Sequence, residues 1–261
     1  MRTMRTIAII NNKGGVGKTT TVINMAAVLS KYHQKRVLVV DADSQINTTE
    51  FYGADPARGN LAEVLRRTPD YGEFAVLNIQ PTDYERIHIL AGSEELMDLD
   101  LTKVELGSAN AAALRNMVAY LEECDGCDYC LVDCPPAFNA ASAAALVAAD
   151  EVIIPVKLDA FGLQGMANLL RQIDNMRRIN PRLRIAGILP TKWYFTTQGE
   201  AAEKTLRENG LKVFGHIRWS KKVDDMTWAQ EPLEVCSPRS GAGVDYRRFV
   251  RQYLEGGDEN G

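Results

Sequence analysis

The sequence has no apolar run that approaches the roughly 18 to 20 residues of a membrane-spanning helix. Its N-terminus also lacks the apolar core of a signal peptide. No internal repeat, low-complexity tract or linker divides the chain. We therefore expect a cytoplasmic protein with one domain over residues 1–261.

The sequence also lacks an excess of basic residues, because its formal net charge is -4. A basic domain is the usual footprint of a nucleic-acid-binding protein, so any such surface must be local. Cysteine is sparse and odd in number, at five residues. An odd count without an export signal argues against a disulfide framework.

What is present is an alternation of short β-branched runs with longer segments of helical period. This pattern predicts an α/β fold, with a mainly parallel twisted sheet flanked by helices on both faces. We expect strands at 6–11, 36–41, 86–91, 129–133, 151–156 and 183–189. We expect helices at 17–32, 110–123, 139–149, 165–178, 199–209 and 244–254, and a short element of unassigned type at 61–67.

A glycine-rich segment follows the first expected strand and fits G-x-x-x-x-G-K-[ST], except that Asn12 replaces the first glycine. Its glycines let successive backbone N–H groups converge on phosphate oxygens, and the following helix adds its positive dipole end. Lys18 would reach the β- and γ-phosphates, and the Thr19 hydroxyl would bind Mg²⁺. The predicted ATP-binding residues are Lys13, Gly14, Gly15, Val16, Gly17, Lys18, Thr19 and Thr20.

Lys13 is not needed to bind phosphate within one subunit. The segment that contains it resembles a motif of a known family. The segment K-G-G-V-G-K-T-T, residues 13–20, resembles the deviant Walker A motif of the ParA/MinD family. The resemblance implies the P-loop NTPase fold, ATP and Mg²⁺ as cofactors, and an ATP-dependent homodimer. It also implies that Lys13 crosses the dimer to the partner's phosphates, where a cation stabilises charge that develops in the transfer.

Two aspartates follow expected strands. Residues 39–45 are similar to the family's D-x-D-P-Q segment, with Ser44 in place of proline, and the match implies that Asp43 positions the attacking water and contacts the Mg²⁺ shell. A carboxylate at the carboxyl end of a parallel strand also points into the ligand crevice, although Asp41 or Asp43 could instead cap the next helix. Residues 129–136 resemble the family's Walker B strand, which implies that Asp133 holds Mg²⁺ through water.

A cysteine pattern suggests a different function. Cys124, Cys127, Cys130 and Cys134, followed by Pro135, reproduce the C-x2-C-x2-C-x3-C-P run of bacterial ferredoxins. An iron-sulfur carrier ATPase is therefore an alternative. Against it, Cys130 and Cys134 lie in and after the strand that presents Asp133, and a buried thiol is a common small hydrophobe.

The region 182–222 concentrates basic residues, with nine Lys or Arg against three Glu, an excess of 9 − 3 = 6. Such a cluster suffices for binding the DNA backbone without sequence preference. Residues 213–222 resemble a segment of the ParA branch, although its usual I-P-R-N is here Ile217-Arg218-Trp219-Ser220. The predicted DNA contacts are Arg218, Lys221 and Lys222, with Lys192 and Arg247 as further candidates.

A MinD-like, membrane-associated positioning ATPase is the other alternative. Such relatives end in a basic amphipathic helix, and Tyr246, Phe249, Val250, Tyr253 and Leu254 could form its apolar stripe. A stripe of this kind is more often core packing. The acidic tail at 255–261 would also be repelled by anionic lipid. We therefore expect no membrane partner.

Together, these features predict a ParA/Soj-like partition ATPase. The resemblance implies that it closes as a homodimer on Mg-ATP, binds DNA non-specifically, and thereby associates with the nucleoid. Lys13, Lys18 and Asp43 are the predicted catalytic residues. Turnover would be slow and stimulated by a ParB-like centromere-binding protein.

Overall fold

The computed structural model describes residues 4–66, 76–99, 109–124 and 126–257. The strands in these residues are β1 Arg5–Ile9, β2 Val37–Asp41, β3 Gln80–Pro81, β4 Ile87–Leu90, β5 Tyr129–Asp133, β6 Glu151–Val156 and β7 Arg184–Pro190. They form one sheet in the order β3-β4-β2-β5-β1-β6-β7, and only the short β3 is antiparallel to its neighbour. The predicted mainly parallel sheet is confirmed.

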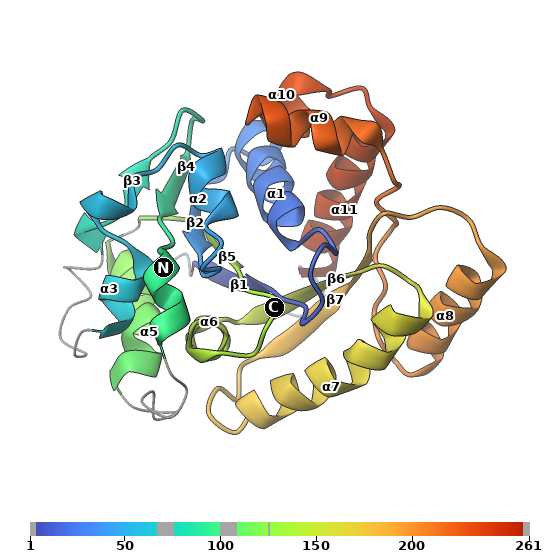
Figure 1. Ribbon diagram of the computed structural model, residues 1–261, viewed down its shortest axis with the longest axis horizontal. Coiled ribbons are helices and arrows are strands. Elements are labelled where there is room, and N and C mark those ends of the chain that lie inside the picture. The colour runs from blue at the N-terminus through green and yellow to red at the C-terminus, as the bar shows by residue number, and fades with distance from the viewer. Residues whose placement is uncertain (1–3, 67–75, 100–108, 125, 258–261) are drawn as a thin grey trace.

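Helices cover both faces of this sheet (Figure 1). They are α1 Lys18–His33, α2 Asn47–Phe51, α3 Leu61–Arg66, α5 Ala109–Glu123, α6 Ala140–Ala148, α7 Ala160–Met176, α8 Thr197–Glu208, α9 Lys221–Ala229, α10 Leu233–Cys236 and α11 Gly241–Gly257. Two 3₁₀ turns, Pro56–Arg58 and Glu94–Asp98, complete the described elements. Together with the sheet, these helices give the predicted P-loop type of α/β fold.

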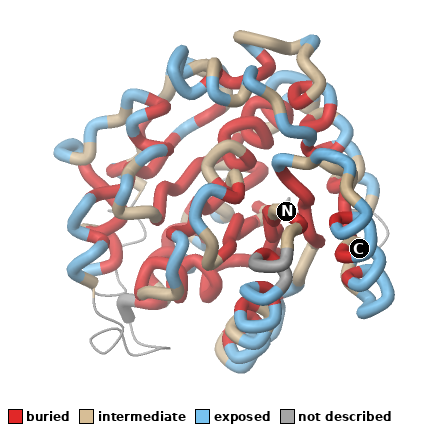
Figure 2. The backbone as a smooth tube through the Cα atoms, turned by 45° about the vertical axis from the view of Figure 1, so that its right-hand side comes forward, coloured by how far each residue is buried: buried red, intermediate tan, exposed pale blue. Residues whose placement is uncertain are grey.

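The strands divide their side chains between two hydrophobic clusters because neighbouring strand residues point to opposite faces. Ile7 and Ile9 join the cluster beneath α1 and α11, whereas Ala8 and Ile10 join the one beneath α5, α6, α7 and α8. Every residue of β2 and β5 is buried. Figure 2 shows this buried interior, with most exposed residues on the outer sides of the helices and in loops.

The apolar side chains of the last helix, α11, pack inside the protein. Tyr246, Phe249, Val250 and Tyr253 are all at most 3% exposed and belong to the cluster that α1 shares. The stripe is core packing, so α11 does not offer it to lipid. No helix in the described parts of the chain is long and apolar enough to span a bilayer.

The expected strands and long helices are present, but several boundaries differ. Helix α7 begins at Ala160 and not near Gly165, because Asp159 caps it by accepting a hydrogen bond from the Gly162 N–H at 2.8 Å. Helices α2, α9 and α10 were not predicted. Residue 67 of the short element expected at 61–67, and residues 258–261 of the acidic tail, lie outside the described residues.

Candidate active site

The glycine-rich loop, residues 11–17, connects β1 directly to α1. Gly17 precedes the helix with a φ of 84°, a left-handed conformation that favours glycine. Having no side chain, Gly17 leaves the first N–H groups of α1 without a side-chain cap. Such groups, together with the helix dipole, attract phosphate. The local geometry is therefore the one that a phosphate-binding loop requires.

Lys18 is buried in the first turn of α1. Its side chain folds back over the loop, and Nζ donates a hydrogen bond to the Lys13 carbonyl at 3.2 Å. Burial lowers the pKa of Lys18, while the negative charges of Asp133 and Asp43 act in the opposite direction. The ammonium thus lies over the loop, in the field of two carboxylates, where it can exchange the carbonyl for phosphate oxygens.

Asp133 ends β5 beside the loop, and its carboxylate collects two hydroxyl groups. Thr19 Oγ1 and Thr48 Oγ1 each donate a hydrogen bond of 2.6 Å to Asp133 Oδ2. The other oxygen, Oδ1, is buried and has no hydrogen-bond partner in the described part of the chain. A buried carboxylate oxygen without a partner, beside a threonine hydroxyl, fits the oxygen ligands and water shell that Mg²⁺ prefers.

Asp41 lies next to Asp133 in the sheet, because β2 and β5 pair in register at these two residues. Asp41 Oδ2 accepts hydrogen bonds from the Thr49 N–H at 2.8 Å and the Thr49 hydroxyl at 2.7 Å. The Gly92 N–H in turn donates to Thr49 Oγ1 at 2.8 Å. Asp41 therefore ties α2 and the loop after β4 to the carboxyl end of the sheet.

Asp43 lies two residues beyond the strand and is only half-buried. Its N–H donates to Asp41 Oδ1 at 3.1 Å, and its own Oδ1 accepts from the Gln45 N–H at 3.0 Å. Its negative charge acts to raise the pKa of both Lys18 and Asp133. The structure therefore brings Lys18, Thr19, Asp43 and Asp133 together at one end of the sheet.

Lys13 has surroundings different from those of Lys18. Its Nζ lies 3.0 Å from Asp159 Oδ1, and Lys157 Nζ approaches the other carboxylate oxygen at 3.4 Å. These side chains line a cavity of about 380 Å³ with Gly14, Gly15, Val16, Lys192, Tyr194 and Trp219. Lys13 therefore lies on the outer side of the loop, whereas Lys18 lies on its inner side.

A small cavity on the other flank of the loop went unpredicted. It measures about 70 Å³ and is lined by Gly17, Thr20, Thr191, Lys192, Ile217, Arg218, Trp219, Ser220, Val223, Asp224 and Tyr246. Thr191 fixes its position by donating to the Val16 carbonyl at 2.7 Å. Two backbone hydrogen bonds between Trp193 and the segment 217–219 bring its walls together. The glycine-rich motif gives no signal for the lining residues that lie outside residues 13–20.

The predicted DNA contacts lie at the start of α9 and the segment before it. Arg218 donates to Asp245 through Nε at 2.7 Å and through the guanidinium NH2 at 2.8 Å, and Asp245 is buried. Lys222 Nζ lies 2.8 Å from Asp225. Lys221 is exposed at the first position of α9. Two of these three cations therefore already pair with carboxylates of the same chain.

The ferredoxin-like cysteines divide between surface and core. Cys124 is exposed and Cys127 half-buried, whereas Cys130 and Cys134 are fully buried. Cys130 lies within β5, which pairs with β1 on one side and β2 on the other. Gathering all four thiols around a cluster would require opening the strand that carries Asp133.

We expect the Asp41–Asp133 pair to make the metal-free protein less stable as the pH rises. Burial, together with the Asp133 charge, raises the pKa of Asp41 to about 7, and burial raises the pKa of Asp133 to about 6. The folded chain then binds more protons than the unfolded chain between pH about 4 and about 7, so this contribution to the unfolding free energy falls across that window.

The measurement is urea denaturation with chelator at several pH values, for the wild type and Asp133→Asn. The wild type should lose more stability between pH 5 and pH 7 than the variant does. The exposed control Asp225→Asn should keep the wild-type slope, because Lys222 lowers the pKa of Asp225. Equal slopes for the wild type and Asp133→Asn would contradict the assignment.

Comparison with known proteins adds a family match. Residues 4–185 match the family model described as an AAA domain. The chromosome-partitioning ATPase Soj of Thermus thermophilus is 34% identical over 259 residues, which cover 96% of each chain. The chromosome partitioning protein ParA of Caulobacter vibrioides is 33% identical over 262 residues, covering 96% of this chain and 94% of that one.

Solved structures agree on the fold. A McdA variant from Cyanothece, solved in complex with ATP, superposes with a TM-score of 0.82 at 23% identity, covering 99% of this chain and 98% of that chain. Cobyrinic acid a,c-diamide synthase from Mycobacterium smegmatis, solved with an ATP analogue and magnesium, gives a TM-score of 0.78 at 27% identity, covering 99% and 97%.

Proposed function

We propose that this chain, which belongs to the Soj/ParA family of partition ATPases, binds Mg-ATP, closes as a homodimer across two nucleotides and then binds DNA non-specifically. Hydrolysis would open the dimer and release the DNA. The protein would thus act as a switch in partitioning a plasmid, a chromosome or a mobile element. A ParB-like centromere-binding protein would stimulate its slow turnover, and the ATP-bound form would associate with the nucleoid.

The observation that carries this proposal is the separation of the two lysines of the loop. Lys18 is 7% exposed and lies over its own loop, whereas the Lys13 side chain is 37% exposed and reaches sideways to Asp159. A single phosphate cradle needs only the inner lysine. The outer cation would leave Asp159 and reach a nucleotide held by a second copy, as an arginine finger does.

The magnesium part of the proposal rests on the residues around Asp133. Thr19 would contribute its hydroxyl directly, and Asp133 and Asp43 would hold water molecules of the metal shell. When bound there, Mg²⁺ neutralises charge on the β- and γ-phosphate oxygens. Solved neighbours that contain ATP, or an ATP analogue with magnesium, support ATP and Mg²⁺ as the cofactors of this chain.

Asp43 would hold the attacking water. It is half-buried at the mouth of the site, and its backbone N–H is fixed by Asp41 at 3.1 Å. Its carboxylate interacts electrostatically with Lys18 and Asp133, the two residues that would face the triphosphate. A positioned carboxylate that orients water is the general-base component of such a reaction.

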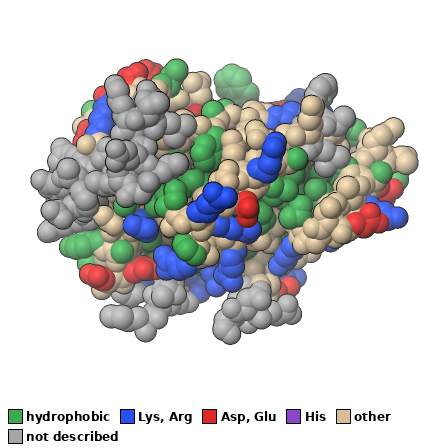
Figure 3. Space-filling view, turned by 90° about the horizontal axis from the view of Figure 1, so that it is seen from below, with side chains coloured by type: hydrophobic (Ala, Val, Ile, Leu, Met, Phe, Trp, Pro, Cys, Tyr) green, Lys and Arg blue, Asp and Glu red, His purple; other side chains and the backbone are tan. Residues whose placement is uncertain are grey.

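The DNA part of the proposal is supported by charge segregation in an acidic protein. Seen from below, Lys and Arg side chains gather near the middle of one face, with acidic side chains mostly toward its margins (Figure 3). Backbone binding needs such a cluster and no base contacts. The Soj and ParA relatives are named for chromosome partitioning, which fits a DNA-bound state.

A DNA-shift assay tests the proposal. At low salt, the wild type should retard a duplex of arbitrary sequence with Mg-ATP and release it with ADP. Lys18→Ala should fail to do so at every nucleotide concentration, because the buried ammonium over the loop is gone. Mant-ATP fluorescence should show the loss of nucleotide binding. If the wild type and Lys18→Ala retard DNA equally, or neither does, ATP-controlled DNA binding is wrong.

A further inference from the structure

A second charged cavity, of about 440 Å³, lies along the edge strand β7. Its wall includes Arg184, the first residue of that strand. The other end of β7 leads to Thr191, which bonds to the glycine-rich loop. At about 3.3 Å per residue, an extended strand of this length separates the cavity from the nucleotide end of the sheet by about 20 Å.

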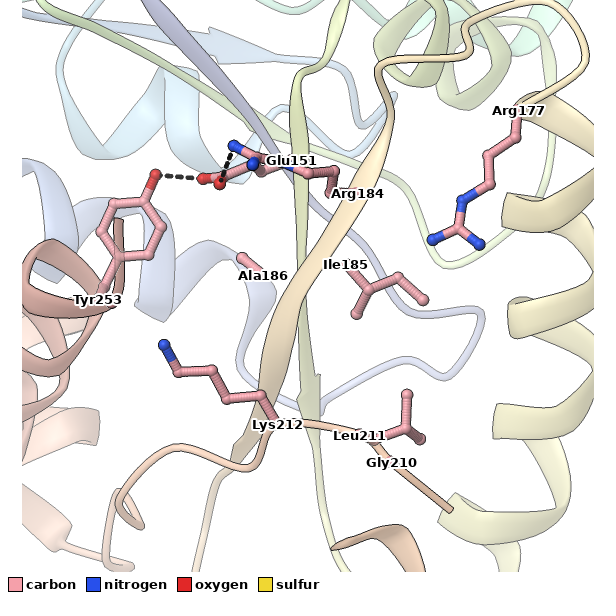
Figure 4. A pocket seen from close by; sticks show the side chains of 10 residues that line it. Glu151, Arg177, Arg184, Ile185, Ala186, Gly210, Leu211, Lys212 and Tyr253 are labelled. Carbon is pink, nitrogen blue, oxygen red and sulfur yellow. Dashed lines mark hydrogen bonds and ion pairs between the residues drawn. The ribbon is translucent and has the colours of Figure 1, made fainter. Parts of the chain in front are cut away.

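Cationic side chains outnumber acidic ones in the wall of this cavity. Arg177, Arg184 and Lys212 line it together with one carboxylate, Glu151, and with Tyr253, Ile185, Ala186, Gly210, Leu211 and Gly256. Figure 4 shows Lys212 and Arg177 on either side of the strand that carries Ile185 and Ala186. Three cations and one carboxylate leave 3 − 1 = 2 positive charges around the cavity.

The carboxylate is fully engaged within the protein. Glu151 is buried, its Oε1 accepts from Arg184 at 3.0 Å, and its Oε2 accepts from the Tyr253 hydroxyl at 2.6 Å. The carboxylate of the lining is therefore already paired, and the exposed Glu255 is the acidic residue that precedes the lining residue Gly256 along the chain. The Glu151 contact also fixes Arg184, because an arginine that donates to a buried carboxylate keeps further N–H groups for a second acceptor.

The other two cations are more weakly held. Lys212 Nζ lies over the Phe214 ring at 5.0 Å, and Lys212 forms no ion pair with a carboxylate among the described residues. Arg177 donates to the Leu183 carbonyl at 3.1 Å and reaches the exposed Asp174 only at 3.4 Å. An exposed ion pair of this kind contributes little and exchanges readily for another anion.

We propose that this corner, which we call the β7 corner, binds the phosphodiester backbone of duplex DNA. It comprises Arg177, Arg184 and Lys212 with the exposed Arg178 and Arg182 of the adjoining turn. Arginine forks match phosphate oxygens, and the apolar Ile185 and Leu211 can contact deoxyribose. The inference rests on the proposed function. It assigns the contacts with the DNA backbone to this corner and not to Arg218 and Lys222, which form ion pairs with carboxylates of the same chain.

The test compares two double variants that remove the same charge. Arg177→Gln with Lys212→Gln alters the β7 corner and leaves the Arg184–Glu151 contact in place. Arg66→Gln with Arg115→Gln is the matched control, since both residues are exposed on the α3 and α5 flank. DNA affinity is measured with Mg-ATP by fluorescence anisotropy over a range of salt, and mant-ATP binding and urea denaturation check that each variant folds.

We expect the corner variant to bind DNA about tenfold or more weakly at low salt. Its slope of log affinity against log salt should also become shallower by about 1.8, because two phosphate contacts at about 0.9 each are lost. The control should keep the wild-type slope, and both variants should keep mant-ATP binding. If the corner variant binds DNA as the control does, the proposal is overturned.

If the wild type binds no DNA, the proposed function is contradicted. A second experiment then tests anion binding at the β7 corner independently of DNA. In a Lys18→Ala background, pyrophosphate should still raise the melting temperature through the β7 corner. Adding Arg177→Gln and Lys212→Gln should remove that rise, whereas adding the two control substitutions should not. A rise that survives the corner substitutions rejects the anion site itself.

Discussion

Replacing Lys13 by alanine is expected to reduce ATP turnover about 10³-fold or more, the size of effect that a cation supplied in trans has in related chemistry. The affinity of the single chain for ATP should change by no more than a few-fold. The reason is geometric, since Lys13 lies with Asp159 on the outer side of the loop while Lys18 covers the inner side.

Lys157→Ala is the matched control for this experiment. Lys157 approaches the same Asp159 carboxylate, at 3.4 Å, but it lies after β6 and outside the loop. Its loss should leave turnover within a few-fold of the wild type. Mant-ATP titration at low protein concentration and steady-state phosphate release give the two quantities. If Lys13→Ala loses ATP binding as completely as Lys18→Ala, Lys13 acts within its own subunit.

The sequence could predict the parts of the site that lie next to one another along the chain. Residues 13–20 form one contiguous loop and helix start whose glycines and lysines have a recognisable spacing, and Asp133 ends a short apolar run of the kind expected for a buried strand. In-register pairing of β5 with β1 and β2 then follows from the parallel sheet and brings Asp133 beside the loop. The expected fold class holds for the same reason.

The parts that the sequence could not predict come from contacts between distant loops. Asp159 meets Lys13 across 146 positions, and no local pattern records that pairing. Thr48 reaches Asp133 from α2, a five-residue helix without a clear apolar period. Helix α9 was not predicted because it is short, with nine residues, and Met226 is the only one of them whose side chain is buried.

The predicted DNA contacts show a second limit of sequence reasoning. Counting cations finds a basic stretch, but it does not show which cations already pair with buried carboxylates. Arg218 has its partner Asp245 in α11, which lies 27 positions away. The charge that a ligand meets depends on such pairs, and therefore on tertiary structure. The β7 corner combines Arg177, Arg184 and Lys212 from three separate segments for the same reason.

Replacing Asp43 by alanine is expected to reduce turnover about 10²-fold or more, which is the usual contribution of a positioned general base. ATP binding and ATP-dependent DNA binding should persist, because the loop, Lys18 and Asp133 are untouched. The variant should therefore remain on DNA long after the wild type has hydrolysed its ATP and dissociated. Anisotropy after a chase with unlabelled DNA measures this retention.

Asp43→Asn separates catalysis from local structure. The asparagine side-chain oxygen can still accept the hydrogen bond from Gln45 N–H that Asp43 accepts at 3.0 Å, so it preserves the turn. It lacks the negative charge that orients and activates water. If Asp43 is catalytic, Asn fails as Ala does, whereas a purely structural role predicts that Asn restores turnover.

Mixing Asp43→Ala with Lys13→Ala tests both assignments at once. In an equal mixture of freely exchanging dimers, half are mixed, and each mixed dimer has one site that combines Asp43 of one chain with Lys13 of the other. Turnover should therefore recover to about a quarter of the wild-type value per chain, although each variant alone is nearly inactive. If Lys13 acted on the nucleotide of its own chain, no mixed dimer would contain an intact site, and mixing would restore nothing.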